Sequence, residues 1–129
     1  MTAPAPETRI EQTPEWVLVH SRGAFALAWF KDLILQIIAL AQASVPPPRA
    51  MLVDLREMTG GRMSDMDRYD TGVLAARHSV GVPIAMVASE TLVDPRRFGE
   101  LVARNRGLNV RVFTNMDEAT AWLRSFTKA

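Results

Sequence analysis

The chain has 129 residues, of which 48% are hydrophobic and 22% charged, a composition typical of one globular domain. Its 15 basic and 14 acidic residues give a formal net charge of +1, so composition offers no electrostatic basis for binding nucleic acid. The absence of cysteine excludes disulfides and thiolate metal sites. The N-terminus lacks the pattern of a signal peptide, and charges interrupt the most apolar segment, so we expect a soluble, cytoplasmic protein without stable membrane insertion.

The N-terminal part of the sequence predicts a tail, a hairpin and a long helix. Residues 1–8 are expected to form a flexible tail, and residues 9–129 a single domain. Residues 9–12 can form a short edge strand that pairs with a strand at 16–20, where β-branched and aromatic residues are frequent. Residues 24–43 contain neither proline nor glycine and favour a helix, which the prolines at 46–48 end.

The segment around residues 51–67 organises the rest of the chain. Residues 51–55 form a short apolar run that predicts a buried strand, and Gly60 and Gly61 then predict a turn. Ser64 precedes Asp67 by three residues, which is the spacing of a helix-starting capping box with Asp in place of Glu. The helix that follows is expected at 65–79.

The C-terminal half alternates strands and helices. Strands are predicted at 84–88 and 108–113, and helices at 95–105, with Asp94 as N-cap, and at 116–126. Strands separated by single helices imply parallel pairing with right-handed crossovers. The predicted fold is therefore an α/β domain, with a mostly parallel sheet, an N-terminal antiparallel hairpin and four helices. The residues expected to be nearly fully buried are Val53, Leu55, Val87, Phe98, Leu101, Val112 and Trp122.

The order of these elements resembles a known family. The segments at 51–57, 82–88, 94–113 and 117–123 resemble the STAS domains of bacterial anti-sigma-factor antagonists and sulfate-transporter tails, in the wider SpoIIAA-like group that includes CRAL-TRIO lipid-transfer domains. The nearest resemblance is to small stand-alone bacterial STAS-like proteins of unassigned function. The resemblance implies a non-enzymatic regulatory or protein-interaction domain with a protein partner.

The resemblance also singles out the loop before the second predicted helix. In antagonists a serine there is phosphorylated, and Ser64 stands at that position within a different flanking sequence. Ser64 has two interpretations, as a helix N-cap or as a phosphosite at the positive end of a helix. Gly60, Gly61 and Arg62 can likewise form a plain loop, or hold an anion through backbone N–H groups and one guanidinium.

Other polar residues give no recognisable reaction chemistry. Asp65, Asp67 and Asp70 fit favourable carboxylates in the first turns of a helix better than a cation site. His20 and His78 lie in no nucleophile–base or ligand spacing, so we expect no catalytic residue, no metal and no cofactor. Four arginines on or beside the third predicted helix form a solvated face or a surface for an acidic partner: Arg96, Arg97, Arg104 and Arg106.

The first predicted helix carries a wide apolar arc. Its polar residues cover only part of the circumference, and packing on a sheet normally needs a stripe slightly wider than about 100°. The surplus predicts a homodimer seam or a groove for an apolar or acyl ligand, unless the helix is deeply buried. The candidate contact residues for either site are Trp29, Phe30, Leu33 and Ile37.

Overall fold

The computed structural model describes residues 5–77, 81–94 and 96–127. The sheet has five strands in the order β1-β2-β3-β4-β5, in which β1 and β2 are antiparallel and all other neighbours are parallel. The elements in chain order are β1 (Glu7–Gln12), β2 (Val17–Ala24), α1 (Leu27–Ala43), β3 (Met51–Thr59), α2 (Asp65–Arg77), β4 (Ile84–Ala88), α3 (Phe98–Asn105), β5 (Val110–Phe113) and α4 (Met116–Thr127). The predicted α/β architecture, the hairpin and the parallel pairing are confirmed.

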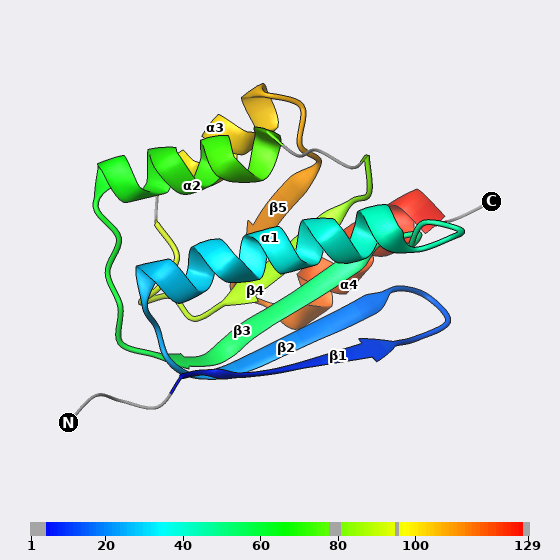
Figure 1. The fold of residues 1–129 in the computed structure, drawn as a ribbon, viewed down its shortest axis with the longest axis horizontal. Helices are drawn as coiled ribbons and strands as arrows, with labels where there is room; N and C mark the ends of the chain where they lie inside the picture. Colours follow the sequence, from blue (N-terminus) through cyan, green and yellow to red (C-terminus); the bar gives the residue numbers. More distant parts are fainter. Residues whose placement is uncertain (1–4, 78–80, 95, 128–129) are drawn as a thin grey trace.

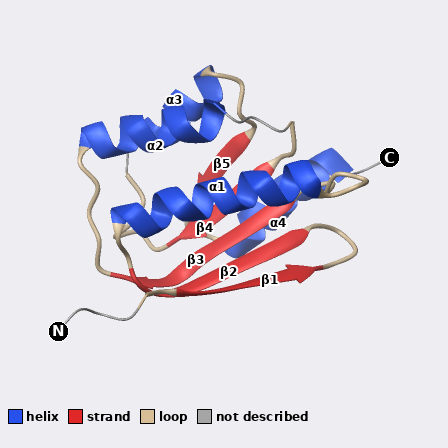
Figure 2. Cartoon of the chain, viewed as in Figure 1, coloured by secondary structure: helices blue, strands red, loops and turns tan. Residues whose placement is uncertain are grey.

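The helices divide unequally between the two faces of the sheet. Because β2 to β5 are consecutive parallel neighbours with crossovers of one hand, α1, α2 and α3 lie on the same face, and α4 covers the other face (Figures 1 and 2). The larger core cluster lies beneath α1 and includes Val53, Leu55 and Ile84. The smaller cluster joins Leu52 and Val87 to Leu123 of α4.

Helix α1 is buried along one regular stripe. Phe30, Leu33, Ile34, Ile37, Ile38 and Ala41 are all buried, which is the i, i+3, i+4, i+7 spacing of a helix packed on a sheet. Leu35 is the large apolar residue of this helix that faces out, with 41% of its surface exposed. The apolar arc therefore leaves much less surplus than the sequence pattern predicts.

Several predicted boundaries differ from the structure. The first helix begins at Leu27 rather than at residue 24, because Gly23 and Ala24 still pair with Met58 and Thr59. Strand β3 continues four residues beyond the apolar run, and a register shift accommodates this extension. Strand β5 begins at Val110, because the N–H of Leu108 donates to the carbonyl oxygen of Ala103 and closes α3 instead. The predicted end of the second helix, residues 78–79, lies outside the described residues.

The predicted start of α3 is wrong. The N-cap is Arg97, which adopts a left-handed backbone conformation with φ of 53°, and the helix begins at Phe98 rather than at residue 95. Asp94 instead holds the preceding turn, because its carboxylate accepts hydrogen bonds from the N–H groups of Arg96 and Phe98. With the helix starting at Phe98, the buried side chains of α3 are those of Glu100, Val102 and Ala103.

The predicted core is correct on β3 and β4 and wrong on β5 and the helices. Val53, Leu55 and Val87 are at most 1% exposed, as predicted. Phe98 and Leu101 are exposed, because α3 turns Val102 and Ala103 toward the sheet. Val112 and Trp122 are half-buried.

Candidate functional site

The loop between β3 and α2 is shaped by its two glycines. Gly60 and Gly61 adopt positive φ of 66° and 86°, which favours glycine at both positions. A Cβ atom at Gly61 would lie 2.4 Å from the ring of Phe25, so close packing against the start of α1 also requires glycine there. The two glycines thus have a structural explanation that requires no ligand.

Ser64 forms the predicted capping box. Its hydroxyl oxygen accepts a hydrogen bond from the N–H of Asp67 at 3.0 Å, and its own N–H donates to the Asp67 carboxylate at 3.1 Å. The side chains of Ser64 and Arg62 are exposed, and Arg62 makes no ion pair within the described residues. Ser64 is therefore an N-cap by geometry, and phosphorylation would place a phosphate beside the Asp67 carboxylate.

The candidate residues on α1 separate into two groups. Phe30, Leu33 and Ile37 are 8%, 2% and 5% exposed inside the single chain, so they offer little surface to a second copy. The sheet together with α2 covers more of α1 than one sheet alone would, and the homodimer seam stays a prediction. Trp29 is half-buried and packs on Phe25 with ring centroids 6.1 Å apart. Phe30 and Ile37 line a cavity, whereas Trp29 and Leu33 do not.

This cavity has a volume of about 140 Å³ and lies between α1, the α2–α3 pair and strands β3, β4 and β5. Its wall is apolar over most of its area, with Ile34 and Ile38 from α1 and Met86 and Val110 from the sheet. Gly72 of α2 also lines it, where α2 packs closely against Gly99 and Val102 of α3. The cavity is shaped for an apolar group.

Four charged residues also line the cavity: Arg68, Asp94, Arg97 and Glu100. The buried Glu100 accepts a hydrogen bond from the N–H of Val112 at 3.2 Å and pairs with Arg97 at 3.4 Å. Burial raises the pKa of Asp94, but hydrogen bonds from the N–H groups of Phe98 and Arg96 and the charges of Arg68 and Arg96 outweigh it, so this pKa lies below its usual value. Both carboxylates are therefore already held by donors of the protein.

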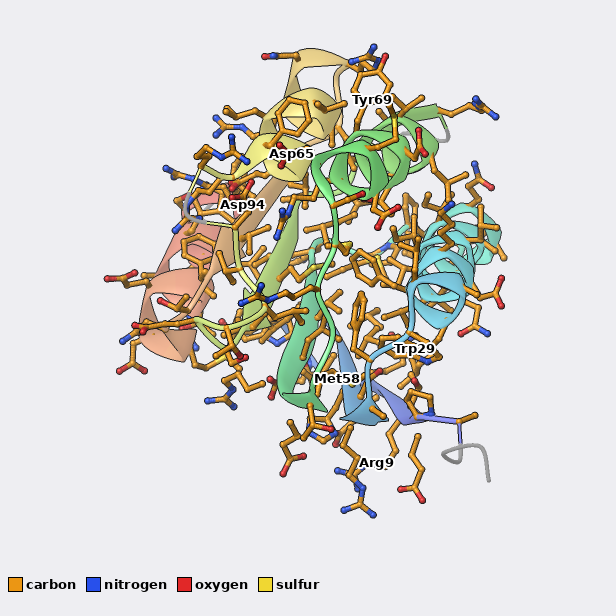
Figure 3. All side chains as sticks on the ribbon, turned by 90° about the vertical axis from the view of Figure 1, so that its left-hand side faces the viewer. Arg9, Trp29, Met58, Asp65, Tyr69 and Asp94 are labelled. Carbon is orange, nitrogen blue, oxygen red and sulfur yellow. The ribbon has the colours of Figure 1, made fainter. Side chains whose placement is uncertain are left out.

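Arg68 is the charged residue of this set whose Nε–H is not hydrogen-bonded. Its Nε is buried and has no hydrogen-bond partner among the described residues. The nearest carboxylate oxygens belong to Asp65, 3.7 Å from Nη1, and to Asp94, 3.8 Å from Nε, and both distances exceed a hydrogen bond. Arg68 thus lies near both Asp65 at the start of α2 and Asp94 in the loop before α3, the two aspartates labelled in Figure 3. The sequence marked Asp94 and Arg97 only as parts of a helix start and an arginine face.

A second surface lies on the outside of α2 and α3. We call it the α2–α3 patch and define it by four exposed residues: Met66, Tyr69, Phe98 and Leu101, which are 66%, 39%, 36% and 47% exposed. The rings of Tyr69, labelled in Figure 3, and Phe98 stack with centroids 6.5 Å apart and join the two helices. Arg106 lies over the Tyr69 ring and donates to its hydroxyl oxygen at 3.2 Å. Exposed large apolar residues gathered in this way are typical of an interaction surface.

The other polar side chains form separate pairs rather than one site. His20 contacts Glu57 across β2 and β3 at 2.7 Å, and Asp54 is bound by both the side chain and the N–H of Arg56. Arg96 pairs with Asp65 at 2.6 Å. No cluster of three potential metal ligands occurs among residues 5–77, 81–94 and 96–127. His78 lies outside the described residues.

The sequence did not indicate the roles of Arg68, Gly72 and Phe98, and the reason is similar for all three. Arg68 and Gly72 have no motif in the sequence, because an arginine and a glycine inside an amphipathic helix are individually ordinary. Their roles arise from contacts with Asp94, Gly99 and Val102, which are distant in sequence. The exposed position of Phe98 depends on the left-handed Arg97, which no residue type in that segment indicates.

Comparison with solved structures defines the fold. The chain is similar to an anti-sigma factor antagonist from Mycobacterium paratuberculosis, with a TM-score of 0.55 and 16% identity over 96% of this chain and 99% of the other. It is also similar to an uncharacterized protein with a SpoIIAA-like fold from Shewanella loihica, with a TM-score of 0.53 and 14% identity over 95% and 98% of the two chains. The domain thus has the STAS-like, SpoIIAA-like fold that the sequence resemblance implied.

Comparisons at the level of sequence add nothing to this. No family model matches the chain, and no curated protein matches it. Within the described residues, no helix is long and apolar enough to cross a membrane.

Proposed function

We propose that this protein is a non-enzymatic regulatory domain that binds a protein partner through the α2–α3 patch. The observation that carries the proposal is the stacked, exposed pair Tyr69 and Phe98 between Met66 and Leu101. Aromatic residues at the centre of a patch commonly supply much of the binding energy of an interface. The likeness of the fold to an anti-sigma factor antagonist supports a regulatory role.

The charges around the patch indicate the chemistry of the partner. Arg62 precedes α2, and Arg104 follows Leu101 by three residues on α3, which places it on the same side of the helix. Neither arginine forms an ion pair within the described part of the chain. We therefore propose a partner surface that is apolar at its centre and acidic at its rim, and binding that weakens as salt rises.

A second copy of this chain is the competing occupant. A two-fold contact through the α2–α3 patch would bring the unpaired arginines of both copies together, which is unfavourable. A contact through α1 would have to use Trp29 and Leu35, because Phe30, Leu33 and Ile37 are buried. A distinct acidic protein satisfies the patch better than a homodimer does.

The test compares two variants in affinity capture from the native host, quantified by mass spectrometry. Met66→Glu/Leu101→Glu adds negative charge at the patch, and Leu35→Glu makes the same change at an exposed apolar site of α1. We expect the patch variant to lose a specific acidic partner that the unmodified protein and Leu35→Glu retain. Equal capture by all three proteins would contradict the proposal, and loss with Leu35→Glu alone would assign the interface to α1.

Ser64 has a place in this proposal as the point of control. Its exposed side chain lies at the start of α2, two residues before Met66. Phosphorylation would add about two negative charges beside a surface that we propose to bind an acidic partner, and would weaken that binding. Partner capture that is unchanged by Ser64→Asp, relative to Ser64→Ala, would count against this control.

A second candidate function is binding of a small apolar molecule. The cavity beneath α1 favours it, because the cavity lies between α1, the α2–α3 pair and the sheet and its wall is mostly apolar. This candidate needs no change to the first, since the cavity lies under α2 and α3 and the patch lies on their outside. Native mass spectrometry of freshly purified protein tests it, with a co-purified ligand as the supporting result.

A further inference from the structure

The cavity beneath α1 combines an apolar wall with one unused hydrogen-bond donor. We propose that it binds a compact carboxylate, whose single ring or short branched chain fills the apolar part and whose carboxylate is bound by Arg68. The proposal rests on the second candidate function, that the cavity holds a ligand, and adds the chemical class of that ligand.

The volume limits the apolar part of the ligand. Dry apolar cavities of about 150 Å³ bind a single benzene ring, and this cavity measures about 140 Å³. One aromatic ring or a branched chain of similar size therefore fills it. A long-chain fatty acid exceeds this volume and would leave most of its apolar chain outside the cavity, so the structure favours a compact acid over a lipid.

The need for an acceptor comes from Arg68. A buried N–H without a partner is costly, and the Arg68 Nε is buried without one. A guanidinium donates two parallel hydrogen bonds to a carboxylate in a fixed planar geometry, which is stronger than a bond to a neutral acceptor. A carboxylate ligand would satisfy Nε in a way that Asp65 and Asp94, at 3.7 and 3.8 Å, do not.

The other polar groups of the cavity wall are already engaged. The Glu100 carboxylate is held by Arg97 and the N–H of Val112, and the Asp94 carboxylate by the N–H groups of Arg96 and Phe98. The Thr71 hydroxyl donates to the carbonyl oxygen of Arg68. A charged group that enters the cavity therefore meets, in the Arg68 Nε–H, a donor without a hydrogen-bond partner, which favours an anion over a cation.

The experiment is an NMR titration of the full chain at neutral pH with four probes. Phenylacetate supplies a ring and a carboxylate, 2-phenylethanol supplies the ring without the charge, and hexanoate and palmitate vary the length of the chain. The side-chain Nε–H signal of Arg68 reports directly on a bond to a carboxylate. We expect phenylacetate to bind more tightly than 2-phenylethanol and to shift the Arg68 Nε–H signal, with hexanoate weaker and palmitate excluded.

Three variants separate the roles of charge and shape. Arg68→Met keeps the length of the side chain without its donors, and should weaken phenylacetate at least about tenfold while leaving 2-phenylethanol unchanged. Arg96→Gln is the matched control, because Arg96 contacts the same Asp65 and Asp94 but does not line the cavity, and it should have little effect. Ala75→Leu places bulk in the cavity wall and should abolish binding of both ring compounds.

The possible contrary results have different meanings. Equal binding of phenylacetate and 2-phenylethanol, unaffected by Arg68→Met, would overturn the carboxylate and leave the apolar site. Preference for palmitate would overturn the size limit. No binding by any probe, with no shift of a cavity residue, would overturn this proposal and the second candidate function together, without touching the α2–α3 patch.

Discussion

At the scale of single residues, the structure gives several side chains a defined physical role. Ser64 and Asp67 satisfy each other's backbone N–H groups at the start of α2. Asp94 holds the turn before α3 and Glu100 anchors α3 to β5. Each role follows from an unsatisfied backbone or side-chain donor that finds a nearby acceptor.

Removal of the Ser64 cap should have a modest and specific cost. We expect Ser64→Ala to lower the free energy of unfolding by about 1 kcal/mol, because the N–H of Asp67 loses its acceptor. Ser64→Asp should restore most of this, since Asp caps a helix about as well as Ser. Urea denaturation measures both variants, and an Ser64→Ala protein as stable as the unmodified one would show that the capping box contributes nothing.

The lowered pKa of Asp94 predicts a dependence of stability on pH. Because its pKa is lower in the folded than in the unfolded chain, the ionised carboxylate stabilises the fold above the usual aspartate pKa of about 3.9. This stabilisation is lost as pH falls through the lower, folded value. The gap in stability between the unmodified protein and Asp94→Asn should therefore be largest near neutral pH and should close in acid, as measured by urea unfolding at several pH values. A gap independent of pH would contradict this assignment.

At the scale of elements, α2 and α3 pack through two glycines. A Cβ atom at Gly72 would lie 2.6 Å from the carbonyl oxygen of Gly99 and 3.0 Å from Cβ of Val102, so a side chain there forces the helices apart. At Gly99 the nearest atom would be the carbonyl oxygen of Arg68, at 3.1 Å. This close crossing places the α2–α3 patch on one continuous surface.

Substitution of Gly72 tests this crossing. Alanine normally stabilises a helix interior by about 1 kcal/mol relative to glycine, so propensity alone predicts a gain. We expect Gly72→Ala instead to lower the free energy of unfolding by about 1–3 kcal/mol, through overpacking against Gly99. Gly99→Ala is the matched comparison and should cost less. Stabilisation by Gly72→Ala would show that the helices separate freely.

The sequence predicted the strands better than their ends. The buried parts of β3 and β4 are apolar runs, so Val53, Leu55 and Val87 were identifiable without a structure. The continuation of β3 to Thr59 was not, because Arg56 and Glu57 are exposed and polar, and the pairing of residues 57–59 with β2 joins partners far apart in sequence. The same holds for the candidate site. The capping box could be predicted because its residues are local in sequence, whereas the cavity could not, because it joins elements far apart in sequence.

At the scale of the whole molecule, the packing of three helices on one face of the sheet explains why the apolar residues of α1 are buried. A helix covered by the sheet below and by α2 beside it can bury Phe30, Leu33 and Ile37 without a second copy. The sequence could not show this, because the wide apolar arc of α1 is the same whether α2 or a partner covers it. The same arrangement leaves the cavity inside and the α2–α3 patch outside.

Truncation of Leu33 distinguishes a core residue from an interface residue. At 2% exposure within one chain, Leu33→Ala should lower the free energy of unfolding by about 2–5 kcal/mol without changing the sedimentation coefficient of the folded protein. An unmodified protein that sediments as a dimer, and a Leu33→Ala protein that sediments as a stable monomer, would restore the seam on α1.

Hydrogen–deuterium exchange of the protein with its captured partner tests the central claim most directly. If the partner binds the α2–α3 patch, amides of α2 (Asp65–Arg77) and α3 (Phe98–Asn105) should exchange more slowly in the complex, while α1 and α4 stay unchanged. The Met66→Glu/Leu101→Glu variant should show no such slowing under the same conditions. Protection confined to α1 or α4, with α2 and α3 unaffected, would contradict the account.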